Sequence, residues 1–91
     1  MARQELFHRA AVIVGKLREK YPDDPAIEQV VIQLTYLIDL EDGKRNDRNQ
    51  LENINIGILT VREIEVLDDD VAELLYKVVE EVELMKNDRR K

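Results

Sequence analysis

The sequence predicts an all-α fold, a compact bundle of about four helices. Apolar residues recur at three- and four-residue steps along most of the chain, and this is the period of a helix. Hydrophobic residues make up 44% of the chain and aromatic residues only 4%, so Leu, Ile and Val must build the core, which suits packed helices. A length of 91 residues allows one core, so residues 1–91 are expected to form a single domain, with residues 86–91 as a frayed tail.

The first two helices are predicted over residues 3–21 and 25–42. An apolar stripe marks the first helix, and a turn with two prolines ends it. Asp24 before Pro25 is typical of an N-cap followed by a first-turn proline, so the second helix begins there. Its apolar residues cover more than one face, which indicates a central helix or one that takes part in an interface. Gly43 is expected to end it.

The third helix, predicted over residues 47–65, depends on a choice between two periods. Ile54, Ile56 and Ile58 alternate with small or polar residues, as they would in a strand. A helical stripe runs longer, and a lone short strand would have no partner, so a helix is predicted. Gly57 within it indicates close packing against another helix. The helical stripe consists of Leu51, Ile54, Ile58, Val61 and Ile64.

Two capping boxes are predicted, each with an acidic residue three positions before a Gln or Glu. Asp47 with Gln50 would begin the third helix, and Asp70 with Glu73 would begin the fourth. The fourth helix is predicted over residues 70–86 because one continuous apolar stripe runs along it.

The balance of charge argues against one class of partner and favours another. The formal net charge is -6, whereas binding to a phosphate backbone needs clustered Lys and Arg. We therefore expect no nucleic acid partner. An acidic surface favours encounter with a basic protein surface. The alternative interpretation is that the acidic charge only keeps the protein soluble. Both interpretations stay open.

Nothing in the sequence indicates secretion or a membrane span. The chain has no Cys, so it has no disulfide framework. Residues 1–8 are charged and lack the apolar core of a signal peptide. No stretch approaches the ~18 apolar residues that a membrane span needs. We therefore expect a cytoplasmic protein with no membrane partner.

The residue types that catalysis and cofactor binding need are largely missing. The chain has neither Cys nor Ser, which leaves Thr35 and Thr60 as small hydroxyl nucleophiles, and no Gly-rich phosphate loop can be drawn. His8 follows Glu5 by three residues, which is half of the Glu-x-x-His arrangement of di-iron bundles. No second pair exists, so His8 is predicted to be a surface residue. We expect no enzyme activity, no metal and no cofactor.

Carboxylates gather around the start of the fourth helix. Against Lys77, this region carries Asp68, Asp69, Asp70, Glu73, Glu80, Glu81 and Glu83. Adjacent residues at a helix start point apart and lack the spacing of a calcium loop, so a metal site is not predicted. A one-signed region of this kind fits a cationic cleft, such as one that binds phosphates or nicotinamide dinucleotides. An ordinary solvated helix face is the alternative.

Several short runs carry a resemblance to a known family. They are Gln33-Leu34-Thr35-Tyr36, Asp47-Arg48 ahead of Leu51, Gly57-Ile58 followed by Val61-Arg62-Glu63, and the acidic turn into the last helix. Over roughly residues 9–85 the chain resembles the immunity proteins of bacterial type VI secretion, and more narrowly those that neutralise an NAD(P) glycohydrolase effector. These runs are helix-packing patterns and not catalytic signatures.

The resemblance implies an all-α cytoplasmic protein that binds a cognate effector toxin and blocks its nucleotide-binding active site. A toxin with another nucleotide-directed activity, such as ADP-ribosyl transfer or alarmone synthesis, would be blocked in the same way. The predicted toxin-binding surface consists of Glu63, Glu65, Asp68, Asp69, Asp70 and Glu73. The second choice is the connection over residues 41–48, with Glu41, Asp42 and Asp47.

A second class of function stays open beside immunity. The second helix carries apolar residues outside its main stripe, Ile32 and Leu40. Such residues suit a self-association seam, so the alternative is a helical adaptor or a homo-oligomer without catalytic activity.

Overall fold

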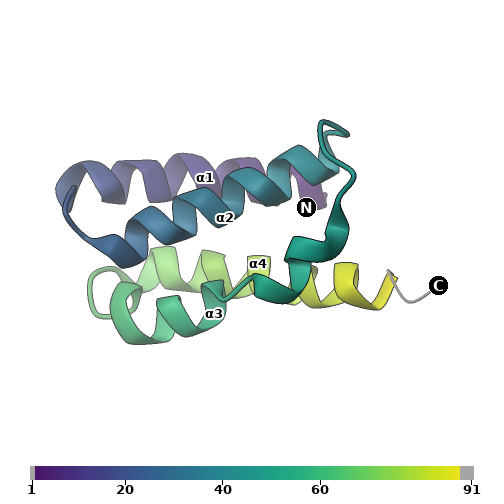
Figure 1. Cartoon of the computed structure of the whole chain (residues 1–91). Helices are drawn as coiled ribbons and strands as arrows, with labels where there is room; N and C mark the ends of the chain where they lie inside the picture. The colour runs from purple at the N-terminus through teal and green to yellow at the C-terminus, as the bar shows by residue number, and fades with distance from the viewer. Residues whose placement is uncertain (1, 89–91) are drawn as a thin grey trace.

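The computed structural model describes residues 2–88, which form an all-α bundle without β-strands (Figure 1). The predicted fold class is therefore confirmed. In chain order the elements are α1 (Arg3–Lys20), α2 (Pro25–Glu41), the 3-10 helix η1 (Arg48–Asn53), α3 (Ile56–Leu59), the π-helical turn η2 (Thr60–Ile64) and α4 (Asp69–Asp88). No helix in this range is both long and apolar enough to cross a bilayer.

Two layers make up the bundle (Figure 1). The antiparallel pair α1 and α2 forms one layer, and α3 and α4 lie beneath it. Successive helices run in opposite directions along the bundle. The turn between α1 and α2 and the turn between η2 and α4 therefore lie at the same end of the molecule. The connection between α2 and η1 lies at the opposite end, beside the start of α1. The two surfaces predicted for binding are therefore at opposite ends of the bundle.

The helix signals around α2 are confirmed. Asp24 is the N-cap, and its Oδ1 accepts hydrogen bonds from the backbone N–H groups of Ala26 at 2.9 Å and Ile27 at 3.4 Å. Pro25 follows it in the first turn, where a missing N–H costs nothing. Gly43, with a φ of 79°, follows the last turn in the left-handed conformation that glycine adopts without strain.

The continuous third helix predicted over residues 47–65 is wrong. Ile54 and Asn55 have extended and irregular backbone conformations that separate η1 from α3. This break changes the helical phase, so that Ile56, Thr60 and Ile64 face the core and are fully buried. The predicted stripe was accordingly mistaken in part, because Ile58 and Val61 are 57% and 59% exposed.

Thr60 is buried among these apolar residues without leaving a hydroxyl unsatisfied. Its Oγ1 donates a hydrogen bond to the carbonyl of Ile56 at 2.7 Å, one helical turn earlier. The π-helical turn that follows is closed by a bond of 2.8 Å from the Glu65 N–H to the Thr60 carbonyl. Gly57 lies against α4, as close packing predicts, and a Cβ there would meet the methyl groups of Val79 at 3.6 and 3.7 Å.

Both predicted capping boxes need correction. Asp47 makes no cap bond, since its carboxylate is engaged by the guanidinium of Arg45. Helix α4 begins at Asp69, one residue before the predicted start. Its cap is Asp68, whose Oδ1 accepts from the N–H groups of Asp70 at 3.0 Å and Val71 at 3.2 Å. These are the second and third residues of the helix, the usual donors to an N-cap side chain.

One buried apolar cluster joins all the elements. Its fully buried members include Phe7 and Val14 of α1, Leu34 and Leu37 of α2, Leu51 of η1, Ile56 of α3, Ile64 of η2, and Leu75, Val78 and Met85 of α4. Helix α4 continues to Asp88, and the last three residues of the predicted frayed tail lie outside the described residues.

Candidate functional site

The acidic surface predicted to bind the toxin, which is called the first-choice surface below, surrounds the turn between η2 and α4. Its residues Glu63, Glu65, Asp69, Asp70 and Glu73 are exposed, whereas Asp68 is half-buried because it caps α4. The turn is closed by backbone bonds of 2.9 Å from the N–H groups of Leu67 and Asp68 to the Ile64 carbonyl. The acidic side chains therefore project from a rigid helix junction.

The structure does not bring all six carboxylates to one face. Asp70 and Glu73 line a groove between α1 and α4. Asp68 instead lines a smaller pocket that also includes Lys16 and Lys20 of α1. Glu65 accepts a hydrogen bond from the Tyr76 hydroxyl, and this bond raises the pKa of Tyr76. The first-choice surface is thus divided, and its most coherent part is the groove.

The groove between α1 and α4 has a volume of about 550 Å³ and a mixed lining. Leu6, Ile13 and Leu74 supply apolar side chains, and four carboxylates face two cations, Arg9 and Lys77. The carboxylates are Asp70, Glu73, Glu80 and Glu81. An acidic groove with apolar side chains suits a segment that carries both basic and apolar residues.

Glu80 and Glu81 were not in the predicted binding set, although the sequence contains the signal for them. The groove residues of α4 recur at three- and four-residue steps, Asp70, Glu73, Leu74, Lys77, Glu80 and Glu81. This spacing places them on one helix face. A search for acidic residues along this face, in place of those nearest the helix start, would have found them.

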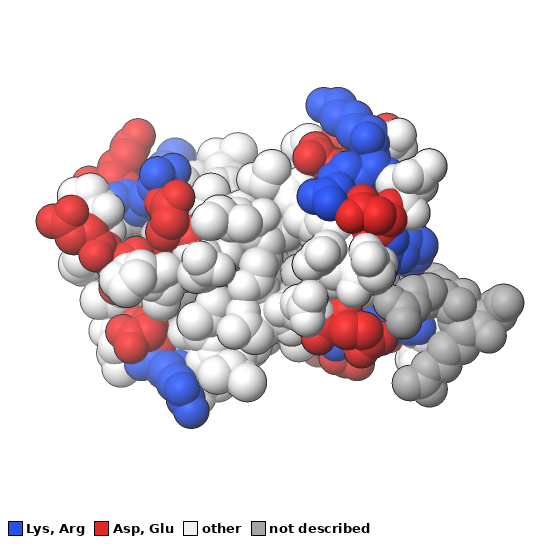
Figure 2. Space-filling view, viewed as in Figure 1, with Lys and Arg blue, Asp and Glu red and all other residues white. Residues whose placement is uncertain are grey.

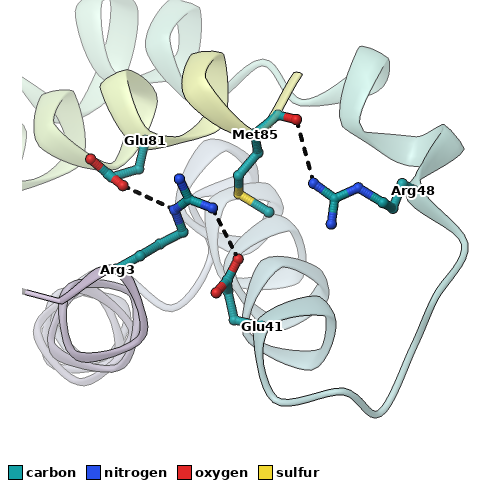
Figure 3. A network of polar contacts seen from close by, with 5 residues as sticks. All are labelled: Arg3, Glu41, Arg48, Glu81 and Met85. Atoms are coloured by element: carbon teal, nitrogen blue, oxygen red, sulfur yellow. Dashed lines mark hydrogen bonds and ion pairs between the residues drawn. The ribbon is translucent and has the colours of Figure 1, made fainter. Parts of the chain in front are cut away.

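The second-choice carboxylates on the 41–48 connection are all engaged within the molecule. Glu41 Oε1 lies 3.3 Å from the guanidinium of Arg3, which also donates a bond of 2.9 Å to Glu81 (Figure 3). Arg48 donates to the Met85 carbonyl at 3.4 Å in the same region. These contacts tie the start of α1, the end of α2, η1 and the last turns of α4 together. Glu41 therefore has a structural role at this junction.

Asp42 and Asp47 are held by neighbouring side chains in the same way. Gln4 donates a hydrogen bond to Asp42, and His8 Nε2 lies 3.5 Å from Asp42 Oδ2. The Gln4 bond, aided by His8, lowers the pKa of Asp42. Arg45 donates two bonds to Asp47, at 2.8 and 2.6 Å, and these lower the pKa of Asp47. Both carboxylates already have cationic or amide partners.

A pocket between α2 and η1 was not predicted from the sequence. It has a volume of about 190 Å³ and is lined by Ile32, Gln33, Tyr36, Arg45, Gln50, Asn53 and Ile54. It lies beside an uncharged band that crosses α2, with charged side chains gathered at the two ends of this face (Figure 2). One of its residues carries a partial signal in the sequence, because Ile32 stands outside the main apolar stripe of α2. The position of η1 against α2 could not be predicted in the same way.

The described residues contain no group of three or more His, Asp or Glu side chains that could hold a metal ion. His8 is exposed, as predicted, and its ring approaches the single carboxylate of Asp42.

Comparison with protein families decides which class of binding protein this is. A family model described as Tsi6 matches residues 2–83, from the start of α1 into the last turns of α4. The chain belongs to the Tsi6 family. Tsi6 is an immunity family of type VI secretion, so the coarse functional prediction is confirmed. No significant match was found among curated proteins or among solved structures.

The Tsi6 match covers both candidate surfaces. The acidic groove residues up to Glu81 and the whole pocket between α2 and η1 lie within residues 2–83. Membership of an immunity family implies that the chain binds a cognate effector, and it suggests a role without catalysis.

Proposed function

We propose that this protein is the immunity partner of an effector toxin that degrades NAD(P) or acts on another nucleotide. It binds the toxin domain in a tight stoichiometric complex and covers the active site. The protein itself performs no chemistry on the nucleotide. In this way it protects the cell that produces the toxin.

The observation that carries this proposal is the Tsi6 family match over residues 2–83. The charge of the chain supports the nature of the target. With a net charge of -6 and an acidic groove between α1 and α4, the protein is attracted to a basic surface. A toxin that binds a phosphate-bearing nucleotide needs cationic groups in its cleft.

The acidic groove is the part of the first-choice surface that best suits this contact. Asp70 and Glu73, which we propose as toxin-binding residues, line it with Glu80 and Glu81. Asp69 is exposed beside them at the first position of α4. Charged groups of this kind chiefly raise the association rate and select the partner. Glu63, Glu65 and Asp68 contribute to the same acidic field with less direct access to the groove.

Inhibition of purified toxin tests the proposal. The cognate toxin domain is held at a concentration well above the dissociation constant, and its consumption of NAD(P) is measured as this protein is added. We expect the rate to fall linearly and reach zero at about one protein per toxin, as stoichiometric inhibition requires. A rate that does not change at several equivalents would contradict the proposal.

A further inference from the structure

We propose that the groove between α1 and α4 selects a toxin segment of mixed charge, in which an acidic residue lies between two basic residues. Lys77 determines this specificity, because it pairs with the acidic residue of the segment. The inference rests on the proposed immunity function and names the chemistry of the partner at the groove. A uniformly basic segment would suit the carboxylates of the groove, but the cations at its centre would repel it.

The charges on the α4 side of the groove change sign twice along the helix. In chain order the charged residues are Asp70, Glu73, Lys77, Glu80 and Glu81. With a helical rise of about 1.5 Å per residue, Glu73 and Glu80 are about 10 Å apart along the axis, and Lys77 lies between them. The groove therefore presents an acidic, a basic and a second acidic position in that order.

The α1 side adds a second cation at the centre of the groove. Helices α1 and α4 run antiparallel (Figure 1), and Arg3 in the first turn of α1 donates a hydrogen bond of 2.9 Å to Glu81. Arg9 lies about two turns further along α1, so it faces a point about two turns before Glu81, near Lys77. The two cations of the groove therefore lie across from one another, with carboxylates on either side.

Most of these charges are available to a partner. The side chains of Arg9 and Lys77 are exposed and have no ion pair or hydrogen bond within residues 2–88. The same is true of the carboxylates of Asp70, Glu73 and Glu80 in this range. The carboxylates of the 41–48 connection, in contrast, are all engaged within the molecule. A partner that pairs with the groove therefore breaks no ion pair of the protein.

Apolar side chains accompany the charges in the groove. Leu6 is buried, whereas Ile13 and Leu74 are only half-buried, so a partner that covers them removes apolar surface from water. The volume of about 550 Å³ accommodates several side chains of a segment. Cover of this kind also lowers the local dielectric constant, which strengthens the ion pairs and makes any mismatch of charge costly.

The charges within the groove distinguish a toxin segment from other occupants. Four carboxylates line it, and they repel the phosphates of a free nucleotide. They also oppose a second copy of this chain, which carries a net charge of -6. A toxin with a basic cleft offers the cations that the carboxylates need, and membership of the Tsi6 family implies a cognate effector as the partner.

Two variants of Lys77 test the inference with a control of matched charge. Lys77→Glu makes the α4 side of the groove acidic throughout, and Lys77→Met removes the charge but keeps a long side chain. Lys44→Glu is the control, because Lys44 is exposed in the connection after α2, does not line the groove, and gives the same change in net charge as Lys77→Glu. Surface plasmon resonance against the purified cognate toxin domain measures the association and dissociation rates. Circular dichroism confirms that each variant folds, and light scattering gives its mass.

We expect Lys77→Glu to raise the dissociation rate about tenfold, because two like charges then face one another in the contact. Lys77→Met should raise it about threefold, since only the ion pair is lost. Both Lys77→Glu and Lys44→Glu should associate faster at low salt, because added negative charge attracts a basic toxin. Lys44→Glu should leave the dissociation rate within about twofold.

A charge swap identifies the acidic residue of the toxin. Acidic surface residues of the toxin domain are replaced by Lys one at a time, and each variant is measured against Lys77→Glu. We expect one of them to restore slow dissociation, because the ion pair is rebuilt with its signs exchanged. If no such variant restores it, Lys77 pairs with no acidic residue of the toxin and the inference is wrong.

The remaining outcomes separate this inference from the immunity function. If Lys77→Glu dissociates from the toxin no faster than wild type, the groove does not select mixed charge, and the inference is wrong while the immunity function stands. If wild type forms a dimer that Lys77→Glu disrupts without changing toxin affinity, the groove serves self-association and the inference is again wrong. If wild type does not bind the toxin, the proposed function fails and the inference falls with it.

Discussion

Asp68 and Asp69 are adjacent, but only Asp68 caps α4. The Oδ1 atom of Asp68 accepts two backbone N–H groups, which α4 would otherwise leave unsatisfied. Asp69 is exposed at the first position of the helix and contributes its charge to the favourable end of the helix dipole. One carboxylate therefore has a structural role, and its neighbour is available to a partner.

This difference predicts different costs for two alanine variants. Asp68→Ala should lower the free energy of unfolding by about 0.5–2 kcal/mol, because the cap is lost. Asp69→Ala should cost less, about 0.3–1 kcal/mol, because only a charge near the helix dipole is lost. Urea unfolding of both variants measures these values. The cap assignment would be contradicted if Asp69→Ala were the more destabilising change.

Asp42 connects two elements, since it lies after the last turn of α2 and is held by Gln4 and His8 of α1. Hydrogen bonding to the charged carboxylate lowers the pKa of Asp42 below its ordinary value. Arg45 lowers the pKa of Asp47 in the neighbouring connection. Both groups favour the folded state while they are ionised.

These lowered pKa values predict a loss of stability in acid. Above the ordinary pKa of 3.8 both carboxylates are ionised in the folded and unfolded states, and their full contribution is present. As the pH falls, the unfolded chain takes up protons first, so the free energy of unfolding decreases until the folded carboxylates are protonated as well. Urea unfolding at about pH 6 and about pH 3 measures the loss. Asp42→Asn should lose less than wild type, and an equal loss would show that Asp42 contributes nothing.

The helices differ in how accurately their bounds can be predicted from the sequence. Helices α1, α2 and α4 have continuous apolar stripes, and at α2 a proline and a capping aspartate mark the start, so pattern reading places them to within two residues. The segment over residues 47–65 combines two periods, and the break at Ile54 and Asn55 lets Leu51, Ile56 and Ile64 all reach the core. Neither period alone predicts this, because the break is favoured by packing against other elements.

The candidate site was predictable to a similar degree. Asp70 and Glu73 do line a groove, and helical spacing extends that groove to Glu80 and Glu81. The pocket beside Ile32 depends on where η1 docks against α2, which is held by the pair of bonds between Gln33 and Asn55. Those residues are 22 positions apart in the chain. Such a contact is set by tertiary packing and leaves no local pattern.

At the scale of the whole molecule, excess negative charge should govern the rate of association with the toxin. Asp69→Lys combined with Glu73→Lys reverses two charges at the acidic groove. We expect this double variant to associate about tenfold more slowly at low salt, because steering of a basic partner is lost. The difference should shrink at high salt as the charges are screened. Stopped-flow mixing with the toxin domain measures both rates.

A control with the same change in net charge separates a local effect from a general one. Glu5→Lys combined with Glu19→Lys reverses two exposed carboxylates on α1 that do not line the groove. It should slow association less than the groove variant does. Equal slowing by the two double variants would mean that total charge matters and that the groove has no special part.

The most direct test of the proposed function is co-expression of this protein with a candidate cognate effector toxin. Cell survival, cellular NAD and co-purification of the two chains are scored together. We expect the cells to survive with their NAD preserved and the two chains to purify as one complex. Cell death with loss of NAD, and no complex, while this protein is present in folded form would contradict it.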